Sequence, residues 1–290
     1  MKKLIKKAFP DAFFLIRRHK KLFGRFPSIT NPRTFNEKII YRMQHPLPSF
    51  SLMADKYKVR DLVESKIGPN YLIPILWHGN TFTIDAYESL PNEFVIKSNH
   101  ASGTNLIVKD KSLHSFNSIL KKTNEWLAMD YDKVNFEKHY KYIDKKLIVE
   151  ELLKDDGGNI PSDYKVHVFR DREGNVRKFI QVDYDRFDEG GFGHRRNLFD
   201  SSWMKINAEL AHDNNSFDEP KPGCLDEMLR LSEDLSMGMG YIRCDWYIIN
   251  NRLFFGEITL THGAGTEVFS PDIVDYEWGS YWDLKSDLVV

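Results

Sequence analysis

In the stretch Arg243-Cys244-Asp245-Trp246-Tyr247-Ile248-Ile249-Asn250-Asn251-Arg252-Leu253-Phe254-Phe255-Gly256-Glu257-Ile258-Thr259, two apolar runs flank the turn residues Asn250-Asn251-Arg252. This pattern predicts a β-hairpin. Side chains two positions apart share a face of a strand, so Arg243 lies with Asp245, and Glu257 lies with Thr259. Pairing of the two strands then brings these four polar side chains together, and two carboxylates share one pocket.

Two carboxylates held close together repel each other unless a cation neutralises them. Oxygen ligands suit Mg²⁺, which keeps several waters and bridges the phosphates of a nucleotide. The hairpin therefore predicts a magnesium-nucleotide site at Asp245 and Glu257. Two simpler interpretations stay open at this point: the carboxylates are exposed strand residues, or Arg243 pairs with one of them.

A second hairpin is predicted from the strand-like runs 93–97 and 106–109, which flank a polar loop at 98–105. Small residues in this loop, among them Ser102 and Gly103, let backbone N–H groups approach an anion closely. Lys97 ends the first strand and is placed to contact a phosphate. The loop matches neither a P-loop nor a dinucleotide fingerprint, and an ordinary hairpin turn is the alternative.

The run Glu150-Glu151-Leu152-Leu153 follows a predicted buried strand at 146–149 and precedes a turn-rich segment. A backbone hinge of this kind can read the edge of adenine while leucine side chains cover the ring. Asp163 is then placed to accept hydrogen bonds from ribose hydroxyls, and Lys165 shares its strand face and can reach a phosphate. The start of a surface helix is the alternative for this run.

The rest of the pattern predicts antiparallel sheets with interspersed helices, an α+β fold. We expect helices at 53–66, 115–129 and 225–237, a strand at 71–76, a hairpin of 163–169 with 177–182, and a turn-rich insert at 184–222. His100, His167, His194 and His262 have no metal-ligand spacing. His262, in the loop after Thr259, is predicted to face the reacting centre.

Composition narrows the class of protein. The 290 residues are 41% hydrophobic with a formal net charge of −1, which predicts a globular enzyme-sized body that does not bind nucleic acid. No 18-residue apolar run or cleavable leader is apparent, so a cytoplasmic location is expected. Cys224 and Cys244 are expected to be reduced. Residues 1–25 are basic and partly amphipathic, which fits either a helix packed on the body or peripheral contact with the inner membrane or with polysaccharide assembly machinery.

Taken in order, these motifs resemble the nucleotide site of the ATP-grasp fold. The closer resemblance, over residues 30–285, is to the bacterial ATP-grasp group associated with teichuronopeptide and capsular polysaccharide synthesis. It rests on Met53-Ala54-Asp55-Lys56-Tyr57-Lys58-Val59-Arg60, Lys97-Ser98-Asn99-His100-Ala101-Ser102-Gly103, Phe179-Ile180-Gln181-Val182-Asp183 and Phe255-Gly256-Glu257-Ile258-Thr259.

The resemblance implies two antiparallel-sheet α+β lobes that grip ATP behind a helical N-terminal extension. The expected divisions are 1–50 for the extension, 51–91 for an N-terminal lobe, 92–155 for the small subdomain and 156–290 for the subdomain with the Mg²⁺ site. Implied roles follow: Lys56 and Lys97 on phosphates, Arg243 on developing charge, and Asp245, Glu257 and Thr259 on Mg²⁺. Thr259 stands where many ATP-grasp enzymes have asparagine, a better Mg²⁺ ligand.

The reaction implied by the resemblance joins a carboxylate to an amine through an acyl phosphate, with release of ADP. A uronic acid, in a sugar nucleotide or a polysaccharide unit, is the expected carboxylate, and an amino acid or amino alcohol is the expected amine. Asp183, Arg186, Arg195 and Arg196 are candidates for binding the acidic sugar, with a solvated loop as the alternative. A glycosyltransferase, for which Asp183-Tyr184-Asp185 is a short motif, a sugar kinase and a non-catalytic assembly partner are the competing functions.

Overall fold

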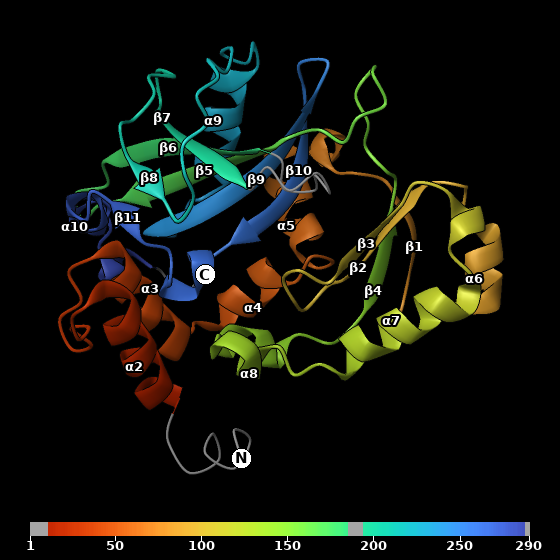
Figure 1. The fold of residues 1–290 in the computed structure, drawn as a ribbon, viewed down its shortest axis with the longest axis horizontal. Coiled ribbons are helices and arrows are strands. Elements are labelled where there is room, and N and C mark those ends of the chain that lie inside the picture. Colours follow the sequence, from red (N-terminus) through yellow and green to blue (C-terminus); the bar gives the residue numbers. More distant parts are fainter. Residues whose placement is uncertain (1–10, 185–193, 288–290) are drawn as a thin grey trace.

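The computed structural model describes residues 11–184 and 194–287. In these ranges the chain forms two larger sheets and one small one (Figure 1). Their strand orders are β1-β4-β2-β3, β10-β9-β5-β6-β7 and β11-β8, and each strand pairs with its neighbours in an antiparallel manner. This arrangement confirms the predicted α+β class.

The four-stranded sheet forms one side of the molecule, with α6 (Ile84–Ser89) and α7 (Phe116–Ala128) beside it (Figure 1). Its strands are β1 (Ile75–Gly79), β2 (Phe94–Ser98), β3 (Asn105–Val108) and β4 (Leu147–Glu150). Ile119 and Trp126 lie two turns apart on α7 and pack into the core under this sheet with Phe94 and Ile96. The predicted hairpin of β2 and β3 is confirmed.

The five-stranded sheet, which we call the large sheet, contains the predicted hairpin of residues 243–259. Its strands are β5 (Asp163–Arg170), β6 (Val176–Tyr184), β7 (Arg195–Asp200), β9 (Tyr241–Ile249) and β10 (Arg252–Thr259). Helix α9 (Leu225–Leu235) packs on it beside α5 (Val59–Ile67), and Trp246 Nε1 donates to Ser232 Oγ at 2.9 Å. Cys224 and Cys244 are buried here as free cysteines, as predicted.

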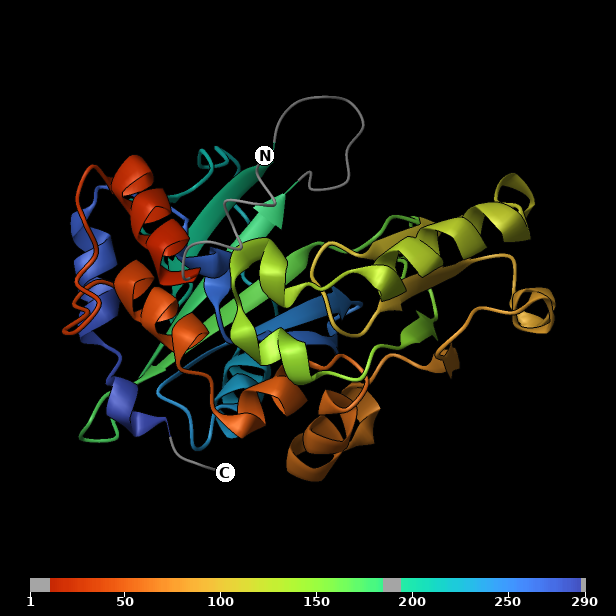
Figure 2. The ribbon, with the colours of Figure 1, turned by 90° about the horizontal axis from the view of Figure 1, so that it is seen from below.

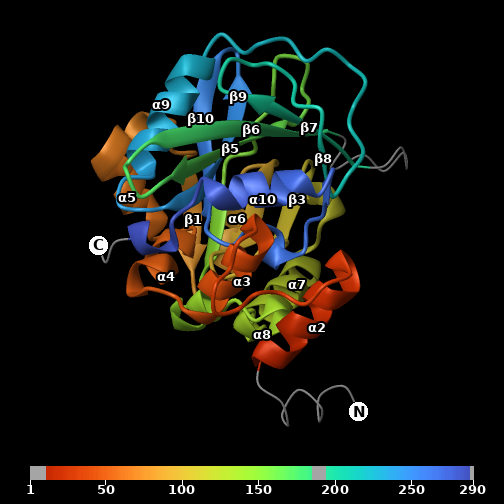
Figure 3. The ribbon, with the colours of Figure 1, turned by 90° about the vertical axis from the view of Figure 1, so that its left-hand side faces the viewer.

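Helices from both ends of the chain pack together against the large sheet. Figures 2 and 3 show α2 (Asp11–Phe23) and α3 (Phe35–Gln44) close to α10 (Ile273–Ser280). Helix α3 begins with a capping box between Thr34 and Glu37. Its buried Phe35 lies 5.0 Å from the Tyr241 ring and 5.5 Å from that of Trp278. The N-terminal helices are therefore part of the core of the large sheet.

Shorter elements complete the chain. They are α4 (Pro48–Ala54), η1 (Pro69–Tyr71), η2 (Lys111–Leu113), α8 (Asp132–Asn135), η3 (Lys138–Tyr142), β8 (Glu209–Leu210), η4 (His262–Gly265), β11 (Phe269–Ser270) and η5 (Leu284–Ser286). Across the described ranges, we find no helix that is both long and apolar enough to cross a membrane.

Three element predictions need correction. The helix expected at 53–66 is two helices, because the Asp55 side chain accepts from the backbone N–H groups of Tyr57 and Lys58 and breaks the first helix. The strand expected at 71–76 starts at Ile75, after Pro74, which has no N–H to donate to a ladder. The insert expected at 184–222 contains β7, whose Leu198 and Phe199 are buried.

The basic N-terminal segment is only partly described. On α2, Leu15 is fully buried, and Arg18 donates to the Ala264 carbonyl oxygen at 2.6 Å and to Asn135 Oδ1 at 3.3 Å. These contacts fit the helix that packs on the body. Residues 1–10, which include Lys2, Lys3, Lys6 and Lys7, lie outside the described residues.

Candidate nucleotide and magnesium site

The hairpin of β9 and β10 brings its polar residues together through a β-bulge. Trp246 pairs with Phe255, whereas Asp245 pairs with Glu257, so the register shifts by one residue at Gly256. A Cβ at Gly256 would lie 3.1 Å from the Asp245 carbonyl oxygen, which favours glycine at this close approach. The bulge leaves the aromatic pair in the core and lets both carboxylates line one cleft.

Arg243 holds Asp245 in a bidentate ion pair. Arg243 Nε donates to Asp245 Oδ1 and Nη2 to Oδ2, both at 2.7 Å, and Nη2 lies 3.5 Å from Glu257 Oε1. Burial alone would lower the pKa of Arg243, but the charge of Asp245 reverses this and raises the pKa, so the guanidinium stays charged. Arg243 therefore does pair with a carboxylate, as one of the simpler interpretations predicted, and the four polar residues also lie together.

His262 lies behind Arg243 and is almost fully buried. Its Nδ1 is 2.6 Å from Arg243 Nη1, and its Nε2 is 2.8 Å from Glu267 Oε2. A guanidinium has no acceptor, so Nδ1 accepts and Nε2 carries the proton toward Glu267. Burial lowers the pKa of His262, which favours this neutral form. The structure therefore places His262 where it orients Arg243.

Lys56 contacts both the hairpin of β9 and β10 and the loop between β2 and β3. Its Nζ donates to the Ala101 carbonyl oxygen at 2.8 Å and lies 3.1 Å from Glu257 Oε2. The base of the loop is fixed because Asn99 donates to Asp55 Oδ1 at 2.9 Å. The tip at Ser102 and Gly103 is exposed, with φ of +74° at Gly103, a conformation that favours glycine.

A polar cleft runs between this loop and the hairpin. The residues that line it come from both sheets, from the loop between β2 and β3 and from the segment between α4 and α5: Lys56, Lys97, Ala101, Ser102, Gly103, Thr104, Asn105, Asp163, Asp245, Tyr247, Gly256 and Glu257. An apolar cavity adjoins the cleft, because Lys97, Asn105 and Tyr247 line both. Together they form one continuous site, which we call the nucleotide cleft.

The apolar part of the nucleotide cleft contains the predicted adenine hinge. It is lined by Glu150, Glu151, Leu152 and Leu153 on one side and by Val95, Ile107, Ile160 and Tyr247 on others. Glu150 is buried, with Lys97 Nζ at 2.6 Å and Arg60 Nη1 at 3.2 Å. Apolar side chains beside a few placed polar groups are typical of a purine pocket.

Lys165, which is predicted to reach a phosphate, is enclosed in a buried ion-pair network, whereas its partner Asp163 also lines the nucleotide cleft. Lys165 Nζ lies 2.8 Å from Asp163 and 3.1 Å from Asp183, and Lys165 does not line the nucleotide cleft. Burial would raise the pKa of Asp183, but His194, Lys165 and Arg196 outweigh it and hold that pKa well below its usual range.

The residues predicted to bind the acidic sugar do not all lie in one place, because some of them belong to this buried network. Asp183 and Arg196 are buried, with Arg196 Nε 2.6 Å from Asp183 Oδ1 and its Nη1 2.6 Å from Glu267 Oε2. Arg195 is exposed on the same strand. None of the three lines the nucleotide cleft. Arg186 and Asp185 lie outside the described residues.

The oxygen donors at Asp245 and Glu257 fit Mg²⁺. Burial raises the pKa of Asp245 even beside Arg243 and Lys165. Within the described ranges no group of three or more acidic, histidine or cysteine side chains is arranged as a metal cage. Mg²⁺ needs no such cage when one or two carboxylates and substrate phosphates supply its ligands. Thr259 Oγ1 lies 3.5 Å from Glu257 Oε1 and lines a neighbouring cavity.

Several residues of the site were not predicted. Tyr247 follows Asp245 at a spacing of two, so strand periodicity was a usable signal for it. Asn105 pairs with Lys97 in the β2–β3 register, and the hairpin prediction contains that information as well. Arg60 reaches Glu150 from α5, and no local sequence pattern indicates this contact.

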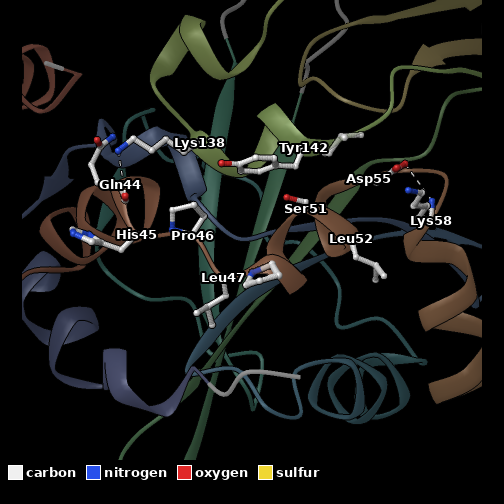
Figure 4. A pocket seen from close by; sticks show the side chains of 12 residues that line it. Gln44, His45, Pro46, Leu47, Ser51, Leu52, Asp55, Lys58, Lys138 and Tyr142 are labelled. Carbon is white, nitrogen blue, oxygen red and sulfur yellow. Dashed lines mark hydrogen bonds between the residues drawn. The ribbon is translucent and has the colours of Figure 1, made fainter. Parts of the chain in front are cut away.

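A larger cavity, of about 800 Å³, lies apart from the nucleotide cleft (Figure 4). Side chains of α3, α4 and η3 surround it, among them Gln44, Leu52 and Tyr142. It shares no lining residue with the nucleotide cleft, and none of the predicted site residues line it.

Comparison with known proteins identifies the family. A family model described as TupA-like ATPgrasp matches residues 37–283, so the chain belongs to this family and has the ATP-grasp fold. No curated protein sequence matches the chain.

Solved structures resemble the chain at low identity. D-Alanine-D-alanine ligase from Helicobacter pylori has a TM-score of 0.44 and 13% identity, with 79% of this chain and 56% of that chain covered. Phosphoribosylamine–glycine ligase from Thermotoga maritima has a TM-score of 0.43 and 11% identity, with 80% and 56% covered. This chain spans little more than half the length of these structures.

Replacement of Lys97 by methionine tests the predicted contact of this lysine with a phosphate: the KM for ATP is expected to rise by about 10- to 100-fold, the cost of one charge-assisted hydrogen bond. Steady-state kinetics of ADP release measure the change. Lys109→Met, at an exposed position just after β3, is the matched control and should behave as wild type. An unchanged KM in Lys97→Met would remove this lysine from the ATP contacts.

Proposed function

We propose that this protein is an ATP-dependent carboxylate–amine ligase that works with Mg²⁺. One observation carries the proposal: Lys97, Asn105 and Tyr247 line both an apolar hinge cavity and a cleft whose walls include Asp245 and Glu257. A purine, its phosphates and a divalent cation are matched in that order along a single site. Membership of an ATP-grasp family supports the same assignment.

In the proposed reaction, a carboxylate oxygen of the donor attacks the γ-phosphorus of ATP, and ADP leaves. The acyl phosphate that forms is attacked at its carbonyl carbon by the amine nitrogen, which makes the C–N bond and expels phosphate. Lys56 and Lys97 bind phosphate oxygens, and Arg243, fixed by Asp245 and His262, stabilises negative charge that develops beside it. When bound, Mg²⁺ supplies further charge neutralisation at Asp245 and Glu257.

For the donor we propose a uronic acid, carried by a sugar nucleotide or a polysaccharide unit. The support is the resemblance to the group associated with teichuronopeptide and capsular polysaccharide synthesis. Exposed Arg195, near one end of the large sheet, remains a candidate contact for an acidic sugar.

The test incubates the protein with Mg-ATP, a uronic acid and an amine, and measures ADP and inorganic phosphate together. Glucuronic acid, galacturonic acid and UDP-glucuronic acid serve as donors, with a panel of small amines. Equal release of ADP and phosphate that requires both substrates is the expected result. ADP without phosphate would indicate a kinase, and UDP release from UDP-glucuronic acid without ATP would indicate a glycosyltransferase. No product with any pair, and no thermal shift with Mg-ATP, would exclude the ligase.

A further inference from the structure

A second cavity, of about 230 Å³, opens beside the nucleotide cleft. The two share Ser102 and Glu257 in their walls, so a molecule in the second cavity lies next to the phosphate end of the cleft. The other walls come from the segments before and within η3, from β9, and from the end of β10 with the turn that follows it. Its size suits a small molecule rather than a polymer segment.

Glu137 is a buried carboxylic acid in the wall of this cavity. Only 5% of the residue is exposed, and Thr261 Oγ1 donates to its Oε1 at 2.5 Å. Neither Glu137 nor Thr261 belongs to the nucleotide cleft or to the predicted metal ligands. A buried carboxylate in a cavity wall is costly unless a cation or hydrogen-bond donors satisfy it. Thr261 supplies one such donor, and Glu257 adds a second carboxylate to the same wall, so a ligand with a positive charge suits this cavity.

Charged and titratable groups surround Glu137 on several elements. Burial raises its pKa to about 7, against the hydrogen bond from Thr261 and the charges of Arg18 on α2 and of Lys56. Tyr131 and Tyr140 also line the cavity, and burial raises the pKa of both. Glu257 and Arg243 complete the charged groups of the wall. A carboxylate in this setting is a better proton acceptor than an exposed one.

The cavity offers little to a carboxylate ligand. Among the residues that line it, Glu137 and Glu257 are two carboxylates against one cation, Arg243, three of whose five N–H groups already point to Asp245 and His262. The hydroxyl groups of Tyr131, Tyr140 and Thr259 can donate to and accept from the hydroxyl group of a ligand. An amine without a carboxylate of its own therefore matches the wall better than an amino acid does.

We propose that this cavity binds the amine acceptor, of the amino-alcohol class, and that Glu137 pairs with its ammonium group and takes up the proton that must leave before attack. This inference rests on the proposed ligase function. The ammonium transfers one proton to the Glu137 carboxylate and becomes a neutral amine. Its nitrogen then bonds to the acyl carbon, the C–O bond to phosphate breaks, and the leaving phosphate takes the second amine proton.

Hydroxylamine, used in place of the amine, tests deprotonation by Glu137 separately from formation of the acyl phosphate. It is neutral near pH 7 and attacks acyl phosphates to give a hydroxamate without needing a base to deprotonate it. With Mg-ATP and a uronic acid, Glu137→Gln is expected to form hydroxamate at the wild-type rate. The same variant is expected to lose amide formation with ethanolamine by about 100-fold or more. Equal hydroxamate formation also serves as the control for folding.

The outcomes distinguish the two proposals. If the wild type forms neither ADP nor hydroxamate, the ligase function and this inference are both wrong. Hydroxamate from both proteins, with undiminished ethanolamine coupling in Glu137→Gln, would overturn the role of Glu137 alone. Glu125→Gln, exposed on α7, is the matched control and should couple ethanolamine as wild type does.

Matched amine pairs test the ligand class. Ethanolamine differs from glycine, and alaninol from alanine, by a hydroxymethyl group in place of a carboxylate. The amino alcohols are expected to give kcat/KM values at least about 10-fold higher than the amino acids, because an unpaired carboxylate beside Glu137 and Glu257 is repelled. Amino acids that couple equally well or better would overturn the assignment to amino alcohols.

Discussion

Replacement of Glu257 by glutamine is expected to lower Mg²⁺-dependent ADP formation by about 100- to 1000-fold, a loss of a few kcal/mol of transition-state stabilisation. The physical reason is that glutamine keeps the shape of the side chain but removes the negative charge that we propose binds the cation. Without that charge Arg243 keeps its ion pair with Asp245, and Lys56 keeps its hydrogen bond to the Ala101 carbonyl oxygen. The Tm should therefore change little, and ADP release measured over a range of Mg²⁺ concentrations checks the prediction.

The matched control is Glu277→Gln, an exposed glutamate on α10, which should behave as wild type. A Glu257→Gln variant that turns over at the wild-type rate at low Mg²⁺ would show that Glu257 is not a metal ligand. Partial recovery at high Mg²⁺ is expected, because Asp245 and the phosphates of ATP still supply oxygen ligands.

Replacement of Arg196 by methionine is expected to lower the free energy of unfolding by about 3–5 kcal/mol, because it removes one partner from a buried charge network. Asp183 and Glu267 both lose a close cation, although Lys165 and His262 remain near them. Chemical denaturation measures this change. Arg195→Met alters the neighbouring, exposed arginine of the same strand, and its effect is expected to stay within about 0.5 kcal/mol.

This pair of variants also separates a structural role from sugar binding. If Arg196→Met unfolds at the wild-type denaturant concentration but has a higher KM for the donor, Arg196 contacts the substrate rather than stabilising the core. The same network predicts acid sensitivity. Because the folded-state pKa of Asp183 is depressed, its stabilisation is present above its unfolded pKa of about 3.9 and is lost as the pH falls further. Arg196→Met should reduce that acid-dependent part.

The local parts of the fold and site could be predicted from sequence. Alternating apolar residues around Asn250-Asn251 are enough to predict the hairpin, and the loop between β2 and β3 is bounded by its own strands. The contacts of Asp245 with Arg243 follow from a spacing of two in one strand. Each of these depends on neighbours in the chain, where strand periodicity holds.

Contacts between distant segments could not be predicted in this way. Glu137 and Thr261 form a hydrogen bond although they lie 124 positions apart in the chain. Lys56 likewise forms an ion pair with Glu257, which lies far from it in the sequence. The burial of Asp183 and Arg196 depends on how β6, β7 and the segment at Glu267 pack together, so the sequence pattern predicts contact with an acidic sugar for residues that lie inside. Charged residues are seldom fully buried, and composition alone favours the surface.

The position of Phe35 has a consequence for synthesis of the chain on the ribosome. Its ring is enclosed by Tyr241, Phe269 and Trp278, residues that are translated more than 200 positions later. Helix α3 therefore cannot complete its packing while the N-terminal part emerges, and it must remain partly exposed until the last strands and α10 arrive. Contacts this distant in sequence slow folding, so a nascent chain of this kind is open to chaperone binding for most of its translation.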